Sequence, residues 1–507
     1  MEARQVTELI YEYLADVGPA MNTIGDAGFV KELASHWKWA GDSLWIAFTI
    51  DPAARWHDDV PVRASDVVFS HAIYTDSAVG AADASDLADI DSVTARDSLT
   101  AVFWFSKRTP HQFFDAAAKM LILPKHLLGA LPVDSLRTVS ARMNPTGSGR
   151  YVFERWDHGT RLELRAVPRH HRGRPGPDRI IWTITPEYQS AVTRLVGGEA
   201  DVLSNLRLET ISALADKSRF NIVTLPGMDY AFLQFNLRDP ANHARPHPLF
   251  SSRALRRALT MALDRKAMVR SLFDTLATVS IGPAVRAFPT TDTSLKQIPH
   301  DPPGASRLLD SLGWKRNTPT AIRVKNGTPL SFTLIVPVSS ASRMKIAVLI
   351  QEALRQAGVG MQIETMDYPA LVTRQIARDF EATLGAWHLG SSPGAIRVTW
   401  TSHAISKSGM NYGSYRNPRF DALVDSALES NSLASSRDYF RRANQEIVDD
   451  APAIWLYEPK TVLAIDKRIR TTPMRPNAWW LDMGSWSIPP SERLPRDAPP
   501  GESQPRR

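Results

Sequence analysis

The sequence predicts an α/β protein that folds as more than one unit. The chain has 507 residues, of which 43% are apolar and 22% charged, the balance of a globular protein with a sizeable core. This length suggests two to three folded units. Strand-length apolar runs alternate with segments of helical spacing along most of the chain. The recurring order of strand, helix and strand predicts a mostly parallel sheet in each lobe.

The first 143 residues are expected to hold short strands and helices with brief connections. Apolar and polar residues alternate at residues 44–50, which predicts a half-buried strand. Ser65 and Asp66 are expected to cap the helix that follows them. The other elements expected here are helices at residues 6–14, 67–74 and 113–120 and a strand at residues 99–105.

A new unit is expected to begin at Asn144 with a turn-rich stretch. The strands expected after it are residues 151–156, 161–166, 180–185, 199–203, 231–237, 330–337, 360–366, 380–387 and 454–463. Helices are expected at residues 187–197 and 342–357, and helical spacing runs through 248–273. Residues 489–507 contain six prolines and few apolar residues, which predicts a disordered tail.

Composition excludes several classes of protein. The chain contains no cysteine, which excludes disulfides, thiolate metal sites and a cysteine nucleophile. No window has the roughly 18 consecutive apolar residues of a membrane helix, and residues 1–13 show no export signal. The net charge of +7 is spread along the chain, so we expect a solvated basic surface and no nucleic-acid partner.

Motifs for catalysis or metal binding are missing from the sequence. It has no phosphate loop, no His-Glu-x-x-His and no Gly-x-Ser-x-Gly, so a hydrolase is the last of the functions considered. His170-His171 and His57-Asp58-Asp59 have neither the helical spacing nor the further ligands of a zinc site. We therefore expect surface histidines, no metal and no cofactor.

Eight segments in a fixed order carry a collective signal. They are AARWHDDVPVRASDVVF (53–69), NPTGSGRYVFERW (144–156), RLVGGEADVL (194–203), FLQFN (232–236), RALRRALTMALD (253–264), ASRLLDSLGW (305–314), NYGSYRNPRFDALVD (411–425) and DAPAIWLY (450–457). Together they resemble the peptide and oligopeptide (family 5) substrate-binding proteins of ABC importers. The resemblance spans about residues 5–486.

This resemblance implies a two-lobed, periplasmic-binding-protein-like α/β fold with an extra subdomain in the first lobe and a ligand cleft between the lobes. Lobe I would comprise residues 1–20, 145–235 and 455–488, the extra subdomain residues 21–144, and lobe II residues 236–454. It also implies a monomeric, extracytoplasmic protein that is not an enzyme. Such a protein would deliver a peptide-like or other small polar ligand to an ABC permease and its ATPase.

The resemblance also implies where ligand contacts should lie. The expected contacts are Tyr230 and Phe232 near the hinge, Trp387, His388, Ser391 and Ser392 in the loop after a second-lobe strand, and Trp400, Asn411 and Tyr412. Phe232 and Trp400 are equally expected in the core, because aromatic residues on strands and helices usually pack. Structural roles are expected for Asp66, Gly149, Glu199, Arg256 and Asp421.

One departure from the family bears on the ligand. Peptide binders usually place an acid after the second-lobe tryptophan, whereas residues 387–394 read WHLGSSPG. A ligand ammonium desolvated without a carboxylate partner would cost several kcal/mol. Peptides with a free N-terminus are therefore expected to bind poorly, unless Glu458, Asp367 or another acid from a different segment reaches that spot.

The ligand itself stays open among peptides, oligosaccharides, opines and metal chelates. A different class of function also stays open, that of the ligand-sensing domain of a regulator or signalling receptor. A regulator would need a helix-turn-helix segment, and the sequence shows none.

Overall fold

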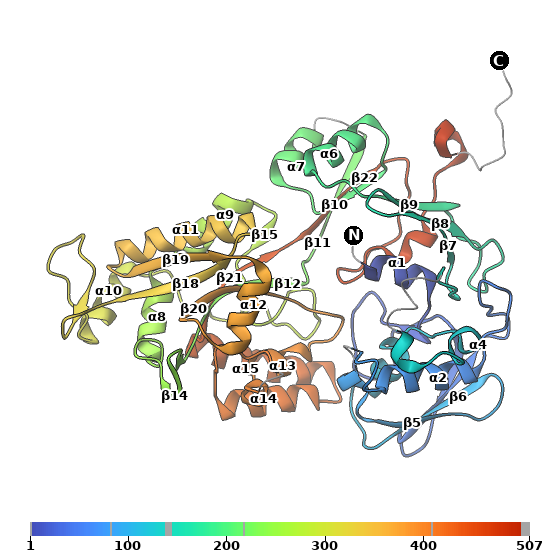
Figure 1. The fold of residues 1–507 in the computed structure, drawn as a ribbon, viewed down its shortest axis with the longest axis horizontal. Coiled ribbons are helices and arrows are strands. Elements are labelled where there is room, and N and C mark those ends of the chain that lie inside the picture. Colours follow the sequence, from blue (N-terminus) through green and yellow to red (C-terminus); the bar gives the residue numbers. More distant parts are fainter. Residues whose placement is uncertain (1–2, 82–83, 137–143, 216–218, 407–408, 498–507) are drawn as a thin grey trace. The chain divides into compact units, whose positions relative to one another are not determined.

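The computed structural model describes residues 3–81, 84–136, 144–215, 219–406 and 409–497. The chain divides into two compact units, unit 1 (residues 1–223 and 463–507) and unit 2 (residues 224–462). In Figure 1, unit 1 runs from blue to green and resumes in red, while unit 2 takes the colours from green to orange. The chain passes between units within strands β11 (Phe220–Leu225) and β22 (Thr461–Asp466). Unit 2 is therefore an insertion in the chain of unit 1, with outer limits somewhat wider than the 236–454 expected for lobe II.

The first sheet of unit 1 is antiparallel throughout. Its strand order is β3 (Ala34–Trp39), β4 (Trp45–Ile50), β6 (Thr100–Phe105) and β5 (Ile90–Ala95). Short connections join β3 to β4 and β5 to β6, and such connections cannot make the crossover that parallel strands need. Helix α3 (Gln112–Ala118) places Phe113 against Phe48 of this sheet, with ring centroids 5.6 Å apart.

Helix α2 (Ala64–Thr75) covers the same sheet and begins three residues before the helix expected at residues 67–74. Arg63 is the N-cap residue, and Asp66, three positions later, accepts the backbone N–H of Arg63 at 2.8 Å. Asp66 also accepts the N–H of Lys125 at 3.0 Å. The expectation that Ser65 and Asp66 cap the helix is thus corrected, because Asp66 acts from inside the first turn.

Two further sheets complete the larger part of unit 1. Strands β7 (Tyr151–Asp157), β8 (Arg161–Ala166) and β9 (Arg179–Thr183) form an antiparallel sheet, and β22 lies between β10 (Val202–Ser204) and β11. The other α-helices and strands among the described residues of unit 1 are α1 (Ala3–Ile10), β1 (Ala15–Asp16), β2 (Val30–Lys31), α4 (Lys125–Leu128), α6 (Tyr188–Gly197) and α7 (Leu208–Ala215).

Unit 2 is built on one six-stranded mixed sheet. The strand order is β15 (Ala277–Thr278), β21 (Ala453–Pro459), β12 (Asp229–Phe235), β20 (Ala382–His388), β18 (Ser331–Pro337) and β19 (Gly360–Met366). Strand β18 is parallel to β19 and β20, whereas β12 is antiparallel to both of its neighbours. The prediction of a mostly parallel sheet in each lobe is therefore wrong, since strand order along the sequence does not fix strand direction.

Residues of β12 alternate between the two faces of this sheet. Ala231, Leu233 and Phe235 belong to the main core with α8 (Arg253–Met261), α9 (Arg265–Phe273), α10 (Pro302–Ser311) and α11 (Ala341–Gln356), and Tyr230 and Phe232 point to the other face. Helices α12 (Tyr368–Ala377), α13 (Ala395–Trp400), α14 (Pro418–Leu428) and α15 (Leu433–Asp450) complete the unit, with two short hairpins, β13 (Arg238–Asp239) to β14 (Asn242–Pro246) and β16 (Val324–Lys325) to β17 (Thr328–Pro329).

The helical spacing at residues 248–273 corresponds to two helices. Asp264 separates α8 from α9 as an N-cap whose side chain accepts the N–H of Ala267 at 2.9 Å. Arg256 of α8 donates to the carbonyls of Phe250 and Asp450, both at 2.6 Å, in a buried position. Burial lowers the pKa of Arg256 to about 10. The structural role expected for Arg256 is thus to satisfy the carbonyl of Phe250 ahead of α8 and that of Asp450 at the end of α15.

The C-terminal segment has defined structure beyond residue 488, where its composition predicts disorder to begin. Residues 490–492 and 495–497 form 3-10 turns, Asp497 pairs with Arg468, and Arg496 lies 2.6 Å from Asp201. The predicted disorder is therefore wrong for residues 489–497, because ion pairs rather than apolar burial hold them. Residues 498–507 lie outside the described residues. Among the described helices, none is long and apolar enough to cross a membrane.

Candidate ligand-binding site

The loop that follows β20 is the centre of the candidate site. Trp387 is paired with Tyr230 across the β12–β20 ladder, and the N–H of Leu389 extends this ladder by donating to the carbonyl of Met228 at 2.8 Å. The N–H of Gly394 then donates to Ser392 Oγ at 3.2 Å, just ahead of α13. The loop is therefore anchored to β12 at its start, and a hydrogen bond within the loop shapes its end.

Two aromatic rings, tilted against that of Trp387, support it from behind. Its ring lies 6.5 Å from that of Phe232 and 6.0 Å from that of Tyr412. Gly385, directly opposite Phe232, leaves room for this packing, because a Cβ there would come within 2.8 Å of the phenyl ring. Trp387 is half-buried, so one part of its ring is fixed by packing and another is accessible.

Four of the nine expected contacts lie in the interior. Tyr230, Phe232, Trp400 and Asn411 are all at most 2% exposed. Trp400 donates its indole N–H to the Tyr230 hydroxyl, and burial raises the pKa of Tyr230 well above its ordinary value. Phe232 packs edge-on against Trp400 at 5.2 Å. These four residues therefore pack beneath the candidate site and support it.

Asn411 is used entirely by the backbone around it. Its Nδ2 donates to the carbonyls of Thr401 and Tyr415, both at 2.9 Å, and its Oδ1 accepts the N–H of Tyr415 at 3.0 Å. Gly413 follows at a position where a Cβ would come within 2.5 Å of the carbonyl oxygen of Phe235. This close approach to β12 fixes the turn that carries Tyr412.

The remaining expected residues, Trp387, His388, Ser391, Ser392 and Tyr412, keep accessible surface. The structure also brings Asp229 to this place, with its Oδ1 3.2 Å from Nδ1 of His388. Sequence reasoning missed Asp229, although it directly precedes Tyr230. Only the register of β12 against β20 places it beside the loop, and register cannot be read from either strand alone.

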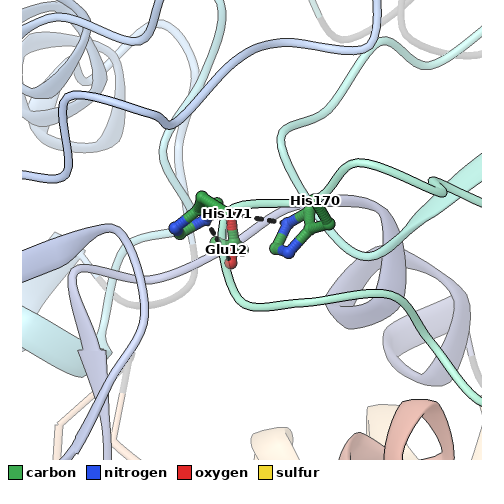
Figure 2. Close-up of side chains that lie close together, drawn as sticks. All are labelled: Glu12, His170 and His171. Carbon is green, nitrogen blue, oxygen red and sulfur yellow. Dashed lines mark hydrogen bonds and ion pairs between the residues drawn. The ribbon is translucent and has the colours of Figure 1, made fainter.

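A second cluster lies in unit 1, where Figure 2 shows His170 and His171 beside Glu12. Nε2 of His171 is 3.1 Å and Nε2 of His170 is 3.6 Å from Glu12 Oε2. All three side chains are almost completely buried. The expectation of surface histidines is thus wrong for this pair, because the segment after β8 folds back onto the residues that follow α1.

The hydrogen bonds of this cluster argue against a metal site. Nδ1 of His170 accepts the N–H of Arg172 at 3.1 Å, so Nε2 carries the proton and donates to the carbonyl of Ser148 at 2.9 Å. Both ring nitrogens of His170 are therefore in use. The guanidinium of Arg172 bridges Glu12 and Glu32. We interpret the cluster as a buried ion-pair network, with two effective ligand groups at most.

Electrostatics support this interpretation. Burial alone would raise the pKa of Glu12, but hydrogen bonds from His170 and His171 lower it overall. Glu12 is therefore an anion that the surrounding donors stabilise, and the network needs no metal to balance its charge.

The fold places the chain in the class of two-lobed periplasmic-binding-protein-like proteins, as the sequence predicts. The structure of the oligopeptide-binding protein AppA from Bacillus subtilis in complex with a nonapeptide matches at a TM-score of 0.79, with 24% identity over 96% of this chain and 95% of that one. NikZ from Campylobacter jejuni, in complex with Ni(L-His), matches at a TM-score of 0.78, with 23% identity over 95% of this chain and 94% of that one.

The sequence comparison defines the family. Residues 28–407 match the model of bacterial extracellular solute-binding proteins, family 5 (middle). The chain belongs to this family, which consists of binding proteins. Among relatives, AppA of Bacillus subtilis is 25% identical over 490 residues, covering 94% of this chain and 87% of its own. The probable D,D-dipeptide-binding protein DdpA of Escherichia coli is 24% identical and covers 88% and 83%.

Proposed function

We propose that this protein captures a small polar, peptide-like ligand outside the cytoplasm and delivers it to an ABC importer. The observation that carries the proposal is Trp387, a half-exposed ring supported by Phe232 and Tyr412 and followed by two serine hydroxyls. A fixed aromatic surface beside polar groups is the usual composition of a small-molecule site. We assign no catalytic step to the protein.

Names of the relatives support the choice of ligand class. AppA is described as oligopeptide-binding, DdpA as probably D,D-dipeptide-binding, and the NikZ structure contains Ni(L-His). Each of these ligands carries amino-acid groups, so we place the ligand of this chain in the same chemical range. The partners proposed on the same grounds are a permease and an ATPase, with the binding protein itself a monomer.

The first experiment identifies the ligand. Mass spectrometry of molecules that co-purify with the protein should reveal a peptide-like compound in a stoichiometric amount. Protein that is unfolded, washed and refolded should then bind this compound in calorimetry and melt at a higher temperature with it, since the ligand binds only the native state. Failure of all peptides, sugars and chelates to bind refolded protein would count against a transport receptor.

Variants then locate the site. Trp387→Ala should weaken binding by about 1–3 kcal/mol if the ring is a wall of the site. Trp104→Ala is the matched control, because Trp104 is a tryptophan of unit 1 at 39% exposure. Equal effects of the two substitutions would remove Trp387 from the site.

A further inference from the structure

A cavity of about 700 Å³ lies within unit 1 and shares no lining residue with the loop after β20. Its wall is formed by Arg219 ahead of β11, the glycines at the end of α6, residues 466–468 at the end of β22, and residues of the C-terminal segment. Small-molecule sites commonly have volumes of about 300–1,000 Å³. The cavity is therefore large enough for a ligand of its own, different from the one proposed to bind beside Trp387.

Arg468 forms the centre of an ion-pair network in the wall of this cavity. Its guanidinium lies 2.7 Å from Asp201 and 3.2 Å from Asp466, and it also pairs with Asp497. The side chain of Arg468 is 15% exposed, and that of Asp466 is almost completely buried. Arg468 therefore holds three carboxylates in place, and these carboxylates can in turn orient further cations.

Two further guanidinium groups are fixed by the same carboxylates. Arg219 donates from Nε to Asp466 at 2.7 Å, and Arg496 donates from Nη2 to Asp201 at 2.6 Å. Both groups also donate to carbonyls at or just beyond the end of α6, which offsets the negative end of that helix. Their side chains remain 34% and 35% exposed, and Arg219 Nη2 and Arg496 Nε have no partner among the described residues. Each can therefore donate a further hydrogen bond to a ligand.

Lys467 adds a cation that is not part of the network. Its backbone N–H donates to the carbonyl of Arg219 at 2.9 Å, which places the two residues side by side. Its side chain is exposed, and its Nζ has no hydrogen bond or ion pair within the part of the chain that the structure describes. Glu492 also lines the cavity, but it is paired with Arg470. The four lining cations thus outnumber the three aspartates of the network, so the remaining charge is positive and favours an anion.

The same cavity has an apolar part. Leu494, which is 36% exposed, and Pro495 both line it. Gly197 and Gly198 contribute backbone without side chains, and a Cβ at Gly198 would come within 3.3 Å of the guanidinium of Arg219. An inorganic ion would interact with the cations and leave Leu494 in contact with water. A ligand with both an acidic group and an apolar body would cover both parts of the wall.

We propose that this cavity binds a small organic anion, namely a carboxylate or a phosphate ester with an apolar body. The acidic group accepts hydrogen bonds from Lys467, Arg219 and Arg496, and the body packs on Leu494 and Pro495. Charge-assisted hydrogen bonds of this kind are stronger than those between neutral groups. This inference goes beyond the proposed function, since it concerns a second ligand and residues of unit 1 alone.

Fluorine-19 NMR of the full-length protein tests the proposal with three probes: 4-fluorobenzoate, 4-fluorophenyl phosphate and the neutral 4-fluorobenzamide. The wild type should bind at least one anionic probe about 10-fold or more tightly than the neutral one, as expected for hydrogen bonds to a charged group. The anion that binds more tightly identifies the acidic group. Lys467→Gln should weaken binding of that anion by about 2- to 5-fold, the effect of one exposed ion pair, and Lys467→Glu should remove measurable binding.

Lys38→Glu is the matched control, because Lys38 is an exposed lysine of β3 in unit 1 with no ion pair among the described residues. It should bind the anionic probe as the wild type does, and so should Trp387→Ala. If the charge reversal at Lys467 disturbs folding, as circular dichroism would reveal, Lys467→Gln decides the test.

Three outcomes overturn the inference and leave the proposed function standing: equal binding of charged and neutral probes, wild-type affinity in the folded Lys467 variants, or no binding of either anion. Loss of binding in Trp387→Ala also overturns it, because the anionic probe then occupies the candidate site of unit 2.

Discussion

Trp400 donates its indole N–H to the hydroxyl of Tyr230 across 2.9 Å, and both side chains are fully buried. This bond joins α13 to β12 beneath the candidate site. Tyr230→Phe should lower the free energy of unfolding by about 1–3 kcal/mol, because the indole N–H is left buried without an acceptor. Urea unfolding measures this change. Ligand affinity should hold, and a loss of affinity with unchanged stability would instead make Tyr230 a direct contact.

His247 should make unit 2 sensitive to acid. Burial lowers its pKa from 6.5 to about 4, while its Nδ1 accepts the N–H groups of Leu249 and Phe250. Between pH 6.5 and about 4, His247 is protonated in the unfolded chain and neutral in the folded chain. The free energy of unfolding should therefore fall as the pH drops from about 6.5 to 4, by up to about 3 kcal/mol.

His247→Asn tests this prediction, because the amide Oδ1 can accept the same N–H groups and does not titrate. Stability of this variant, measured by urea unfolding at several pH values, should depend less on pH in that window. His243→Asn, at an exposed position, is the control and should keep the wild-type profile. Identical pH profiles for all three proteins would contradict a role of His247.

Glu458 should matter for stability and not for ligand preference. Glu458 is 2% exposed, and Arg286 is its ion-pair partner. Glu458→Gln leaves the guanidinium without its counter-charge and should cost about 3 kcal/mol, as removal of one partner of a buried pair does. Thermal unfolding measures the loss. A fully stable variant that discriminates poorly between free and acetylated peptides would instead indicate that Glu458 contacts the ligand.

The C-terminal segment should have a stabilising part and a dispensable part. A chain that ends at Asp497 should melt like the full chain, whereas one that ends at Ile488 loses the partner of Arg468 and should be about 1–3 kcal/mol less stable. Asp497→Asn in the full chain separates the ion pair from the loss of backbone. If both truncated chains melt alike, the ion pairs at residues 489–497 contribute nothing to stability.

Local structure could be predicted from the sequence wherever one residue pattern decides it. The strands β8 and β19 have the expected limits, and the α/β class is confirmed. Strand direction could not be predicted, because it depends on which strands meet. The same limit applies to Pro489–Asp497, whose composition indicates disorder but whose charges find partners on residues such as Asp201 and Arg468.

Candidate residues could be predicted as a neighbourhood but not by role. Trp387 and Tyr412 lie together as a resemblance to the family implies, whereas Asn411 is engaged by backbone groups. Two pairs of residues could be recognised only in the folded structure. His171 is 159 positions from Glu12 in the sequence, and His388 is 159 positions from Asp229. No pattern of single residues indicates such contacts, because each depends on how separate segments are brought together.

The insertion of unit 2 into unit 1 bears on how the chain is made. Unit 2 is complete once Val462 has been synthesised. Unit 1 still lacks β22, the central strand of its β10-β22-β11 sheet, and Trp480, which bonds to Glu8 at 2.9 Å. On the ribosome, unit 2 can therefore fold before unit 1 is complete. Until β22 has been synthesised, β10 and β11 of unit 1 stay unpaired. During that interval these open strand edges are the part of the nascent chain most exposed to wrong pairing.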